Sequence, residues 1–366
     1  MQASNRVFKF GRLAVMSLLF ITTSCKKEVV IDEPGDAVPR KLDLKAPSNF
    51  PIVVDDVDNP LTIEGVELGR LLFYDNRLSG SNRLSCASCH RQEIAFSDGV
   101  ALSQIGESAR TLTRHAPALI NLAWANNGLF WDGGSTNLES QAFAPLASED
   151  EMHQNLDQLK VELKAIPEYV KKFKLAFNGE ITPALVVKAL AQFQRTLISA
   201  NAKYDQYIRK ENATTLNQQE LRGLILVDSK CQGCHSGALF TDNNYHNNGI
   251  DEDFSNTALD GLYQGRYRIS YNPSDLGKYK TPTLRNIALT APYMHDGRFN
   301  TLSEVMDHYQ HGIKVSTTTD ILLFQKNGSV GIALTDEDKK DIIAFLHTLT
   351  DDQFIHNNNF SKPILP

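Results

Sequence analysis

Two short cysteine motifs constrain this chain more than any other feature. The first reads CASCH and ends at His90, and the second reads CQGCH and ends at His235. A zinc site would bring both cysteine pairs onto one ion, normally with a much shorter spacing between them. A thioredoxin-like thiol site belongs to a βαβ pattern, which the chain does not show. C-x-x-C-H is also the attachment motif of haem c, whose iron is bound by the histidine.

The cysteine count favours haem. The chain has five cysteines, and the two motifs use four of them. The fifth, Cys25, lies close to the N-terminus, so no cysteine remains for a structural disulfide. We therefore expect two covalently bound haems c. Their attachment points are Cys86, Cys89, Cys231 and Cys234, and their iron ligands are His90 and His235.

The first 24 residues have the composition of an export signal. Three basic residues precede the apolar run 13–21, which is too short to span a membrane, and small residues precede Cys25. Small residues before a cysteine resemble a bacterial lipobox, so we expect lipidation of Cys25, with secretion and a free Cys25 as the alternative. Residues 25–55 would then be a polar tether. The mature protein would be held on the periplasmic side of a bacterial membrane, in our interpretation the outer one.

The charge of the chain argues against nucleic acid as a partner. The formal net charge is −6, and it becomes −9 when residues 1–24, with three basic and no acidic residues, are removed. Binding to a phosphate backbone requires a basic surface. An acidic surface can instead attract a basic redox partner.

Helical patterns dominate the rest of the chain. Residues 182–199 begin with Thr182 as a cap and Pro183 in the first turn, and residues 216–229 lead helically into the second motif. Residues 335–350 begin with a threonine cap and acidic residues and carry an apolar stripe. No run of strand-like alternation appears.

These patterns predict an all-α fold with two cytochrome c-like domains, each enclosing one covalently bound haem c. We place the boundary between them in the polar segment RKENATT. The predicted domains are residues 56–212 and 213–352, followed by a tail at 353–366.

Eight segments, in their order along the chain, resemble those of the bacterial dihaem cytochrome c peroxidases, including the branch of the methylamine dehydrogenase maturation enzyme. They are CASCH, HAPALINLAW, FWDGG, QAFAPL, DEM, CQGCH, TPTLRNIALTAPYMHDGRFNTL and LTDEDKKDIIAFL. The resemblance runs from about Leu68 to Leu349. It implies an enzyme that reduces hydrogen peroxide to water with electrons from a small cytochrome c or a cupredoxin.

The resemblance makes the first haem peroxidatic and the second an electron store. Trp131 matches the tryptophan between the haems, Gln141 and Glu151 match the distal pair, and Pro145 matches a proline of the distal wall. A carboxylate there can move a proton between the peroxide oxygens, and an amide can orient the peroxide. From chemistry alone, this stretch can also be an ordinary loop with a buried tryptophan and solvated acids.

Two departures from the family concern the region of the first haem. No histidine occurs between His90 and His115, where the family's peroxidases carry a histidine that caps the oxidised iron. We therefore expect an open first iron that needs no prior reduction. The family asparagine that helps to bind calcium between the haems aligns with His115. Imidazole is a poor calcium ligand, which disfavours calcium and makes His115 a hydrogen-bonded residue between the haems.

The third departure concerns the ligand above the second iron. The segment TLSEVMDHYQHG opens with a capping box at Thr301 and predicts a helix. Met306 and Tyr309 share one face of this helix, and His308 points away. Counted from the matched HDG, Tyr309 takes the place of the family's ligand methionine; Met306 is its rival and His311 a weaker third. The alternative is that Met306 and Tyr309 are core residues and the ligand lies elsewhere.

Three other residues receive weaker interpretations. Arg285 can pair with a haem propionate or serve a purely structural loop. His295 matches a family residue near the second haem. His246 is interpreted as a surface or ordinary structural residue without a role in the chemistry.

Two alternatives to a peroxidase stay open. One is a peroxide-dependent enzyme that matures or modifies another molecule, which the missing cap and the altered second ligand favour. The other is a dihaem electron-transfer protein without catalysis, against which Gln141 and Glu151 argue. A homodimer is also left open.

Overall fold

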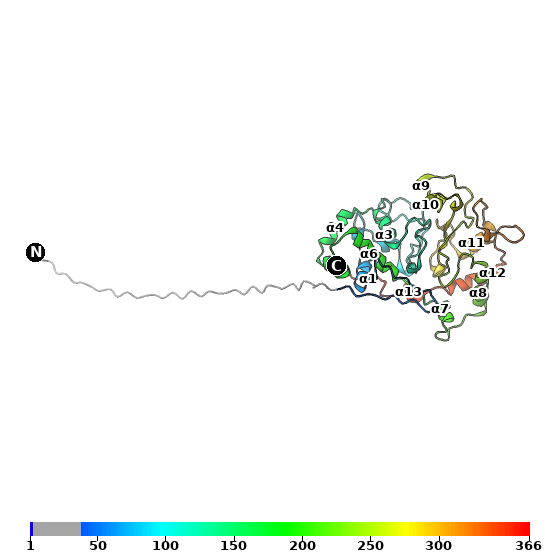
Figure 1. Ribbon diagram of the computed structural model, residues 1–366, viewed down its shortest axis with the longest axis horizontal. Helices are drawn as coiled ribbons and strands as arrows, with labels where there is room; N and C mark the ends of the chain where they lie inside the picture. The colour runs from blue at the N-terminus through cyan, green and yellow to red at the C-terminus, as the bar shows by residue number, and fades with distance from the viewer. Residues whose placement is uncertain (3–37) are drawn as a thin grey trace. The chain divides into compact units, whose positions relative to one another are not determined.

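The computed structural model describes residues 1–2 and 38–366 of the chain (Figure 1). The expected export signal, Cys25 and the tether up to residue 37 lie outside the described residues. From residue 38 onward the chain belongs to one compact unit. Within this part, none of the helices combines the length and the apolar character that crossing a bilayer requires.

The described chain is rich in helix, which confirms that part of the predicted fold. The α-helices are α1 (Ile63–Phe73), α2 (Cys86–Cys89), α3 (Leu138–Ala147), α4 (Leu156–Lys164), α5 (Pro167–Phe177), α6 (Pro183–Arg195), α7 (Lys203–Ile208), α8 (Gln218–Lys230), α9 (Ala258–Gly261), α10 (Tyr267–Ser270), α11 (Leu302–Asp307), α12 (Asp336–His347) and α13 (Asp352–Ile355). A π-helical turn, His308–Gly312, follows α11. Strands β1 (Tyr245–His246) and β2 (Tyr279–Lys280) form one antiparallel pair.

The helix starts that the sequence predicted are confirmed. The Thr182 hydroxyl accepts a hydrogen bond from the third residue of α6, and Pro183 opens that helix. Thr335 caps α12 in the same way, and its capping box is complete. Thr301 and Glu304 form the predicted capping box of α11. These caps satisfy backbone N–H groups that a helix leaves without partners at its start.

Two helix pairs of similar construction lie beside the two cysteine motifs. Helix α1 precedes the first motif and packs against α6, and helix α8 leads into the second motif and packs against α12. Both pairs depend on a glycine at the crossing. A Cβ atom on Gly69 would lie 1.9 Å from the carbonyl oxygen of Ala189, and one on Gly223 would lie 1.9 Å from that of Asp341. The backbones therefore approach too closely at both crossings for any side chain.

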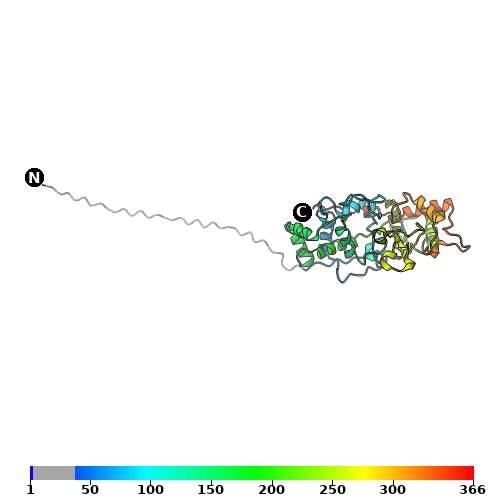
Figure 2. The same cartoon turned by 90° about the horizontal axis from the view of Figure 1, so that it is seen from above.

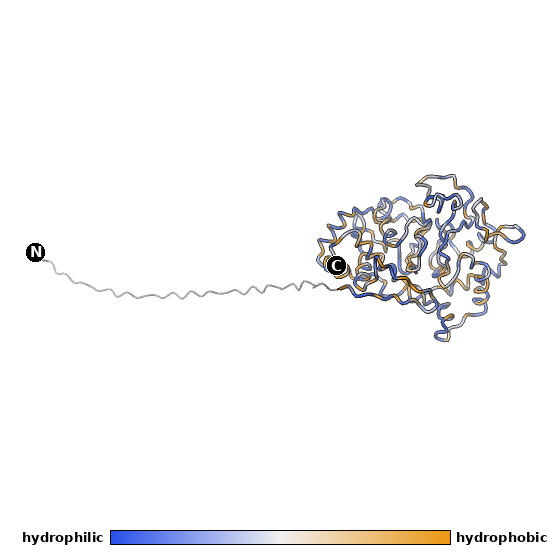
Figure 3. Tube along the Cα trace, viewed as in Figure 1, coloured by the Kyte–Doolittle hydropathy of each residue, from blue (hydrophilic) through white to orange (hydrophobic). Residues whose placement is uncertain are grey.

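The buried apolar residues form two main clusters. One gathers α1, α3, α4, α5 and α6, and the other gathers α8, α11 and α12. In Figures 1 and 2 the first group of helices lies at one end of the described unit and the second at the other. Figure 3 shows that hydrophobic stretches run along these helices. Each cysteine motif thus has its own core beside it.

The segments expected as a tail and a tether pack onto this body. Phe354, beyond the predicted second domain, is buried in the first cluster, and its ring lies 5.8 Å from that of Phe96. The Tyr74 hydroxyl donates a hydrogen bond to the carbonyl of Phe360. In the expected tether, Phe50 is buried against Trp124 with ring centroids 5.3 Å apart. The isolated aromatic residues of these polar segments pack against apolar surface elsewhere in the fold. The local composition of the segments does not predict these contacts.

Candidate active site

The first motif is held in place by a short helix and a loop. Ser85 and Ser88 form a capping box around α2, which carries Cys86 and Cys89. Nδ1 of His90 lies 2.7 Å from the carbonyl oxygen of Phe96. Burial lowers the pKa of His90, so the imidazole is neutral near pH 7. With Nδ1 bound to a carbonyl, Nε2 is the nitrogen left to ligate a metal.

The motif cysteines do not have the properties of redox thiols. None of the four forms a disulfide, and each is partly buried. Burial among protein atoms raises the pKa of Cys86 to about 12, and those of Cys89 and Cys231 to about 11. A catalytic cysteine needs a lowered pKa. The part of the chain that the structure describes also contains no group of three or more His, Cys, Asp or Glu residues suited to hold a metal ion.

Gln141 and Pro145 lie on α3. Gln141 is buried and faces a cavity, and its Oε1 atom has no hydrogen-bond partner among the described residues. A buried amide oxygen without a partner is costly, so this atom points to a group that binds there. Pro145 lies inside the helix, and its carbonyl accepts a hydrogen bond from Met152. The proline thereby joins α3 to the loop that carries Glu151.

Glu151 follows α3 and lies close to the first motif. Burial and, less strongly, the neighbouring Asp150 raise the pKa of its carboxyl group. Its charge in turn contributes to the raised pKa of both Cys86 and Cys89. A carboxyl group with a raised pKa beside a haem attachment motif is suited to take up and return a proton.

The loop without the family's capping histidine packs against Glu151. The backbone N–H of Glu107 donates to the Glu151 carbonyl at 2.8 Å. A Cβ atom on Gly106 would lie 1.7 Å from the carbonyl oxygen of Asp150. Glycine is therefore required where the loop crosses the segment that positions Glu151.

Trp131 and His115 join the two halves of the site. The Trp131 Nε1–H donates to the His115 carbonyl at 2.8 Å, and the Lys280 N–H donates to the Trp131 carbonyl at 2.7 Å. His115 is buried, and its Nδ1 lies 2.8 Å from the Val100 carbonyl oxygen. The structure thus makes His115 the hydrogen-bonded residue that the sequence suggested. Both side chains line the cavity that Gln141 faces.

This cavity lies beside the second motif. It measures about 470 Å³ and is mostly apolar in its lining. Cys231, Cys234 and His235 all face it. Nδ1 of His235 lies 3.2 Å from the Phe240 carbonyl oxygen, which repeats the arrangement around His90. Burial lowers the pKa of His235 as well, so this imidazole is also a neutral ligand.

Tyr309 and Met306 face the same cavity, as the predicted helix face requires. Burial raises the pKa of Tyr309 to about 12; a hydrogen bond from Asn248 acts in the opposite direction, and the nearby Cys234 and Cys231 thiols raise it further. Tyr309 therefore lies near the second motif. Met306 is buried at the same wall, whereas the third candidate, His311, is exposed.

His308 is not among the residues that line the cavity, in agreement with the prediction that it points away from the face of Met306 and Tyr309. His308 is buried, and its Nε2 lies 3.0 Å from the carbonyl oxygen of Asn248. Helix α11 ends at Asp307, and the chain continues as the π-helical turn, which rotates the following side chains relative to a regular α-helix.

His295 is a buried neutral residue at the cavity. Its ring stacks on Tyr279 with centroids 3.7 Å apart, and burial lowers its pKa to about 3. The His295 carbonyl accepts a hydrogen bond from the N–H of His115. The guanidinium carbon of Arg114 lies over the Tyr279 ring, 5.0 Å from its centroid. These contacts tie the second haem region to the residues around Trp131.

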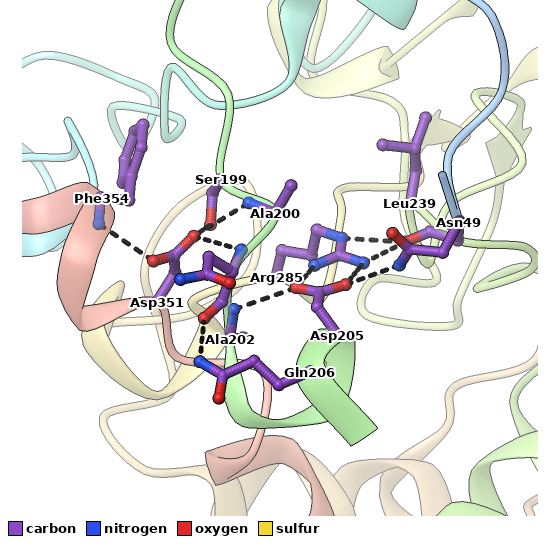
Figure 4. Close-up of polar contacts among 12 residues, drawn as sticks. Asn49, Ser199, Ala200, Ala202, Asp205, Gln206, Leu239, Arg285, Asp351 and Phe354 are labelled. Atoms are coloured by element: carbon purple, nitrogen blue, oxygen red, sulfur yellow. Dashed lines mark hydrogen bonds and ion pairs between the residues drawn. The ribbon is translucent and has the colours of Figure 1, made fainter. Parts of the chain in front are cut away.

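Arg285 has a carboxylate partner within the protein. Its two terminal nitrogens each lie 2.8 Å from an oxygen of Asp205, and both side chains are 0% exposed. Arg285 also donates to the Ala238 carbonyl, and Asp205 accepts a further bond from Asn49 (Figure 4). Of the two interpretations of Arg285, these contacts correspond to the structural one. Arg285 also lines the cavity beside the second motif, so its pairing with a haem propionate stays a prediction.

His246 is a residue whose setting the sequence did not reveal. Its Nδ1 lies 2.5 Å from an oxygen of Asp320, and its Nε2 lies 2.9 Å from one of Asp242. The hydrogen bond to Asp320 is the main reason that its pKa rises to about 11, with Cys234 and Asp242 adding to the effect. It therefore serves as a charged structural link at the cavity rim. Asp320 is 74 residues away in the sequence, so no local sequence pattern predicts its contact with His246.

These residues fit a covalently bound haem at each motif. Two thiols and a neutral imidazole whose Nδ1 contacts a carbonyl oxygen occur at both places, and the second set opens into the cavity beside Tyr309. The orphaned oxygen of Gln141 marks a polar binding position in the lining of this same cavity. The residues present are those that haem c attachment and ligation require.

Comparison with known proteins agrees with this chemistry. Residues 63–213 match the family model of the di-haem cytochrome c peroxidases. The methylamine utilization protein MauG of Methylorubrum extorquens is 36% identical over 295 residues, which cover 80% of this chain and 79% of the relative. The cytochrome-c peroxidase IdrP1 of a Pseudomonas species is 34% identical over 342 residues, covering 84% and 86%.

A solved structure is similar over nearly its whole length. It is a MauG-like protein associated with microbial copper homeostasis, with 34% identity and a TM-score of 0.79 over 88% of this chain and 99% of that one. A fold shared at this level, together with relatives above 30% identity over most of the chain, establishes the relationship. The chain is a member of the di-haem cytochrome c peroxidase family.

Proposed function

We propose that this chain is a dihaem cytochrome c peroxidase that reduces hydrogen peroxide to water. The observation that carries the proposal is Glu151, a carboxyl group with a raised pKa beside the cysteines of the first motif. Relatives that are named cytochrome-c peroxidases are similar in sequence to this chain over most of its length, and their names support the same reaction. Haem bound at the two motifs would supply the redox chemistry.

The protein residues around the first motif have separate tasks. His90 would hold the haem iron through Nε2, since its Nδ1 contacts the Phe96 carbonyl. Gln141 offers its unpartnered side-chain amide to orient the peroxide and the departing water. Glu151 takes the proton from the inner oxygen of the peroxide and delivers it to the outer one, which then leaves as water. Trp131, fixed at both its ring and its backbone, would carry electrons between the two haem sites.

The second motif would receive electrons from outside the protein. His235 and Tyr309 are our proposed ligands of its iron, with Met306 as the rival. Small cytochromes c or cupredoxins are the proposed donors, and the name cytochrome c551 peroxidase of one relative supports a cytochrome donor. The acidic mature chain suits a basic donor.

We also propose the cellular setting and the domain division. Two cytochrome c-like domains, residues 56–212 and 213–352, would each hold one covalent haem c. The two apolar clusters, one beside each motif, support this division. Export to the periplasm with a lipid on Cys25 rests on the sequence of residues 1–25.

Glu151→Gln tests the function directly. General acid–base groups typically contribute about 10²–10⁴-fold to a rate, so turnover of peroxide with reduced cytochrome c should fall by at least about 100-fold. A pyridine haemochrome assay should still find two haems per chain. Glu149→Gln, which removes an exposed carboxylate two residues away, is the control and should keep full activity. Equal activity of both variants would show that Glu151 is not the acid–base group of the reaction.

Tyr309 supports a second candidate function. A phenolate ligand stabilises oxidised iron, whereas a thioether raises the potential. Oxidising equivalents held at the second haem could then act on another molecule, as in a maturation enzyme. MauG relatives at 36% and 33% identity are consistent with this alternative. Rapid peroxide turnover with a cytochrome c donor would favour the peroxidase.

A further inference from the structure

Two tyrosines lie beside Trp131, the residue proposed to carry electrons between the haem sites. Tyr279 lines the same cavity as Trp131, and the N–H of its neighbour Lys280 donates to the Trp131 carbonyl at 2.7 Å. Tyr245 pairs with Lys280 between the two strands, and a Cβ atom on Gly133 would lie 2.1 Å from the Tyr245 hydroxyl oxygen. Tyrosine is readily oxidised, so both rings can compete with Trp131 for oxidising equivalents.

Each of these tyrosine rings has an arginine over its face. The guanidinium carbon of Arg266 lies 4.3 Å from the centroid of the Tyr245 ring, and that of Arg114 lies 5.0 Å from the centroid of Tyr279. The ammonium nitrogen of Lys280 is 5.2 Å from the Tyr245 centroid. A cation is attracted to the face of a neutral ring. It repels the same ring once an electron has been removed, because the ring then carries a positive charge.

Both arginines are held in place by the segment that follows Trp131. Arg266 donates to the backbone carbonyls of Asp132 and Gly133 at 3.0 Å and 3.2 Å. Arg114 lies 3.7 Å from a carboxylate oxygen of Asp132, which is buried, and donates to the Leu262 carbonyl at 2.5 Å. The two guanidinium groups are therefore fixed over the rings by contacts of their own.

The phenol groups of the two tyrosines are bound in a way that retains their protons. The Tyr245 hydroxyl donates a hydrogen bond to the carbonyl of Asn127, and the Tyr279 hydroxyl donates to the carbonyl of Tyr263 at 3.5 Å. A backbone carbonyl accepts a hydrogen bond but is too weak a base to take the proton. A ring that lost an electron here would keep its positive charge, and the cation over it makes that state unfavourable.

We propose that Arg266 and Arg114 protect Tyr245 and Tyr279 from oxidation during the reaction with peroxide. This inference rests on the proposed function, because hydrogen peroxide supplies the oxidising equivalents. In the side reaction that the arginines suppress, a tyrosine loses two electrons and two protons and gains an oxygen atom from water. One hydrogen peroxide takes up these electrons and protons and becomes two waters. The arginines thus keep the oxidising equivalents available to Trp131 and the electron donor.

The test measures the oxidation of each tyrosine in the haem-loaded protein. Excess hydrogen peroxide is added without an electron donor, and peptides are analysed by mass spectrometry for the gain of one oxygen atom. Arg266→Gln removes the charge and keeps an amide that can donate to the backbone, whereas Arg266→Lys keeps the charge. Arg222→Gln is the control, since it removes an arginine of α8 that pairs with Asp341 at 2.6 Å. Tyr293, which lines the cavity and donates to a backbone carbonyl, is the internal reference.

Arg266→Gln should raise the oxidised fraction of Tyr245 by at least about tenfold, and Arg266→Lys should leave it near that of the natural chain. At 4.3 Å and an effective dielectric constant of about 20, Coulomb's law gives a unit charge an influence of more than about 100-fold, which water entering the vacated space lowers. Arg114→Gln should raise the oxidation of Tyr279 in the same way and leave Tyr245 unchanged.

Unchanged oxidation of Tyr245 in Arg266→Gln would overturn the proposal. An equal increase at Tyr293, or the same increase in Arg222→Gln or Arg266→Lys, would also overturn it, because loosening of the fold would then explain the result. A natural chain that does not consume peroxide would overturn the proposed function and this inference with it. The rate of peroxide consumption, followed in the same samples, distinguishes that failure from failure of the inference alone.

Discussion

Removing the carboxylate of Asp205 should destabilise the protein strongly. Asp205 and Arg285 are both 0% exposed and form a bidentate pair with two contacts of 2.8 Å. Asp205 also accepts hydrogen bonds from the N–H of Ala202 and from Asn49 (Figure 4). Asp205→Ala would leave a guanidinium buried without its charge partner. Breaking a buried pair in this way costs about 3–5 kcal/mol, a large part of a typical stability of about 5–15 kcal/mol.

The assay is urea unfolding of the haem-loaded protein, followed by circular dichroism. Glu211→Ala is the control, because Glu211 is 44% exposed and pairs with Arg209 at 2.8 Å on the surface. Exposed pairs of this kind contribute about 0–1 kcal/mol. The double variant Asp205→Leu with Arg285→Met should recover part of the loss, since it removes both charges.

The same experiment separates the two interpretations of Arg285. If Asp205→Ala costs no more than Glu211→Ala, the buried pair is not the main partner of Arg285, and our reasoning from the structure is refuted. In that case Arg285→Met should shift a haem potential, as expected for a residue that binds a propionate. Our account predicts a large loss of stability and no shift of that kind.

Three further predictions concern single side chains. Because burial raises the pKa of Glu151 above its ordinary 4.5, peroxide turnover should fall as the pH drops through that raised pKa, and Glu151→Gln should lack this acid limb of the pH–rate profile. The pKa of His246 is raised from 6.5 to about 11, so the stability that protonated His246 contributes should be complete below pH 6.5 and lost as the pH rises toward 11. In urea titrations, the difference in stability between the natural chain and His246→Gln should therefore shrink over this range. A constant difference would contradict this prediction. Tyr309→Phe should change the spectrum of the second haem and raise its potential, whereas Met306→Leu should do neither; the reverse outcome would make Met306 the ligand.

Features with local causes could be predicted from the sequence. The haem motifs place their cysteines and histidine within five residues, and the caps at Thr182, Thr301 and Thr335 act within one helical turn. The shared face of Met306 and Tyr309 follows from helical spacing, and both side chains do face the cavity. In each case, the residues that determine the structure are neighbours in the chain.

Features that depend on distant residues could not be predicted. Arg285 meets Asp205 across 80 residues, and His246 meets Asp320 across 74. The sequence shows that such residues can pair, but the fold decides with which partner. His308 is buried against the carbonyl of Asn248, 60 residues away, and no local pattern predicts this contact. The sequence likewise could not predict that the buried side-chain oxygen of Gln141 lacks a hydrogen-bond partner, because this depends on the residues around it in the fold.

The central claim is that the first haem site accepts peroxide in the fully oxidised protein, with Gln141 and Glu151 ready and no histidine between His90 and His115 to cap the iron. The most direct test is rapid mixing of the oxidised dihaem protein with hydrogen peroxide without any donor, followed by addition of reduced cytochrome c. Our account predicts an immediate spectral change at the first haem, and then oxidation of two cytochrome c molecules for each peroxide consumed. An oxidised protein that stays unreactive toward peroxide until it has been half reduced would contradict the claim.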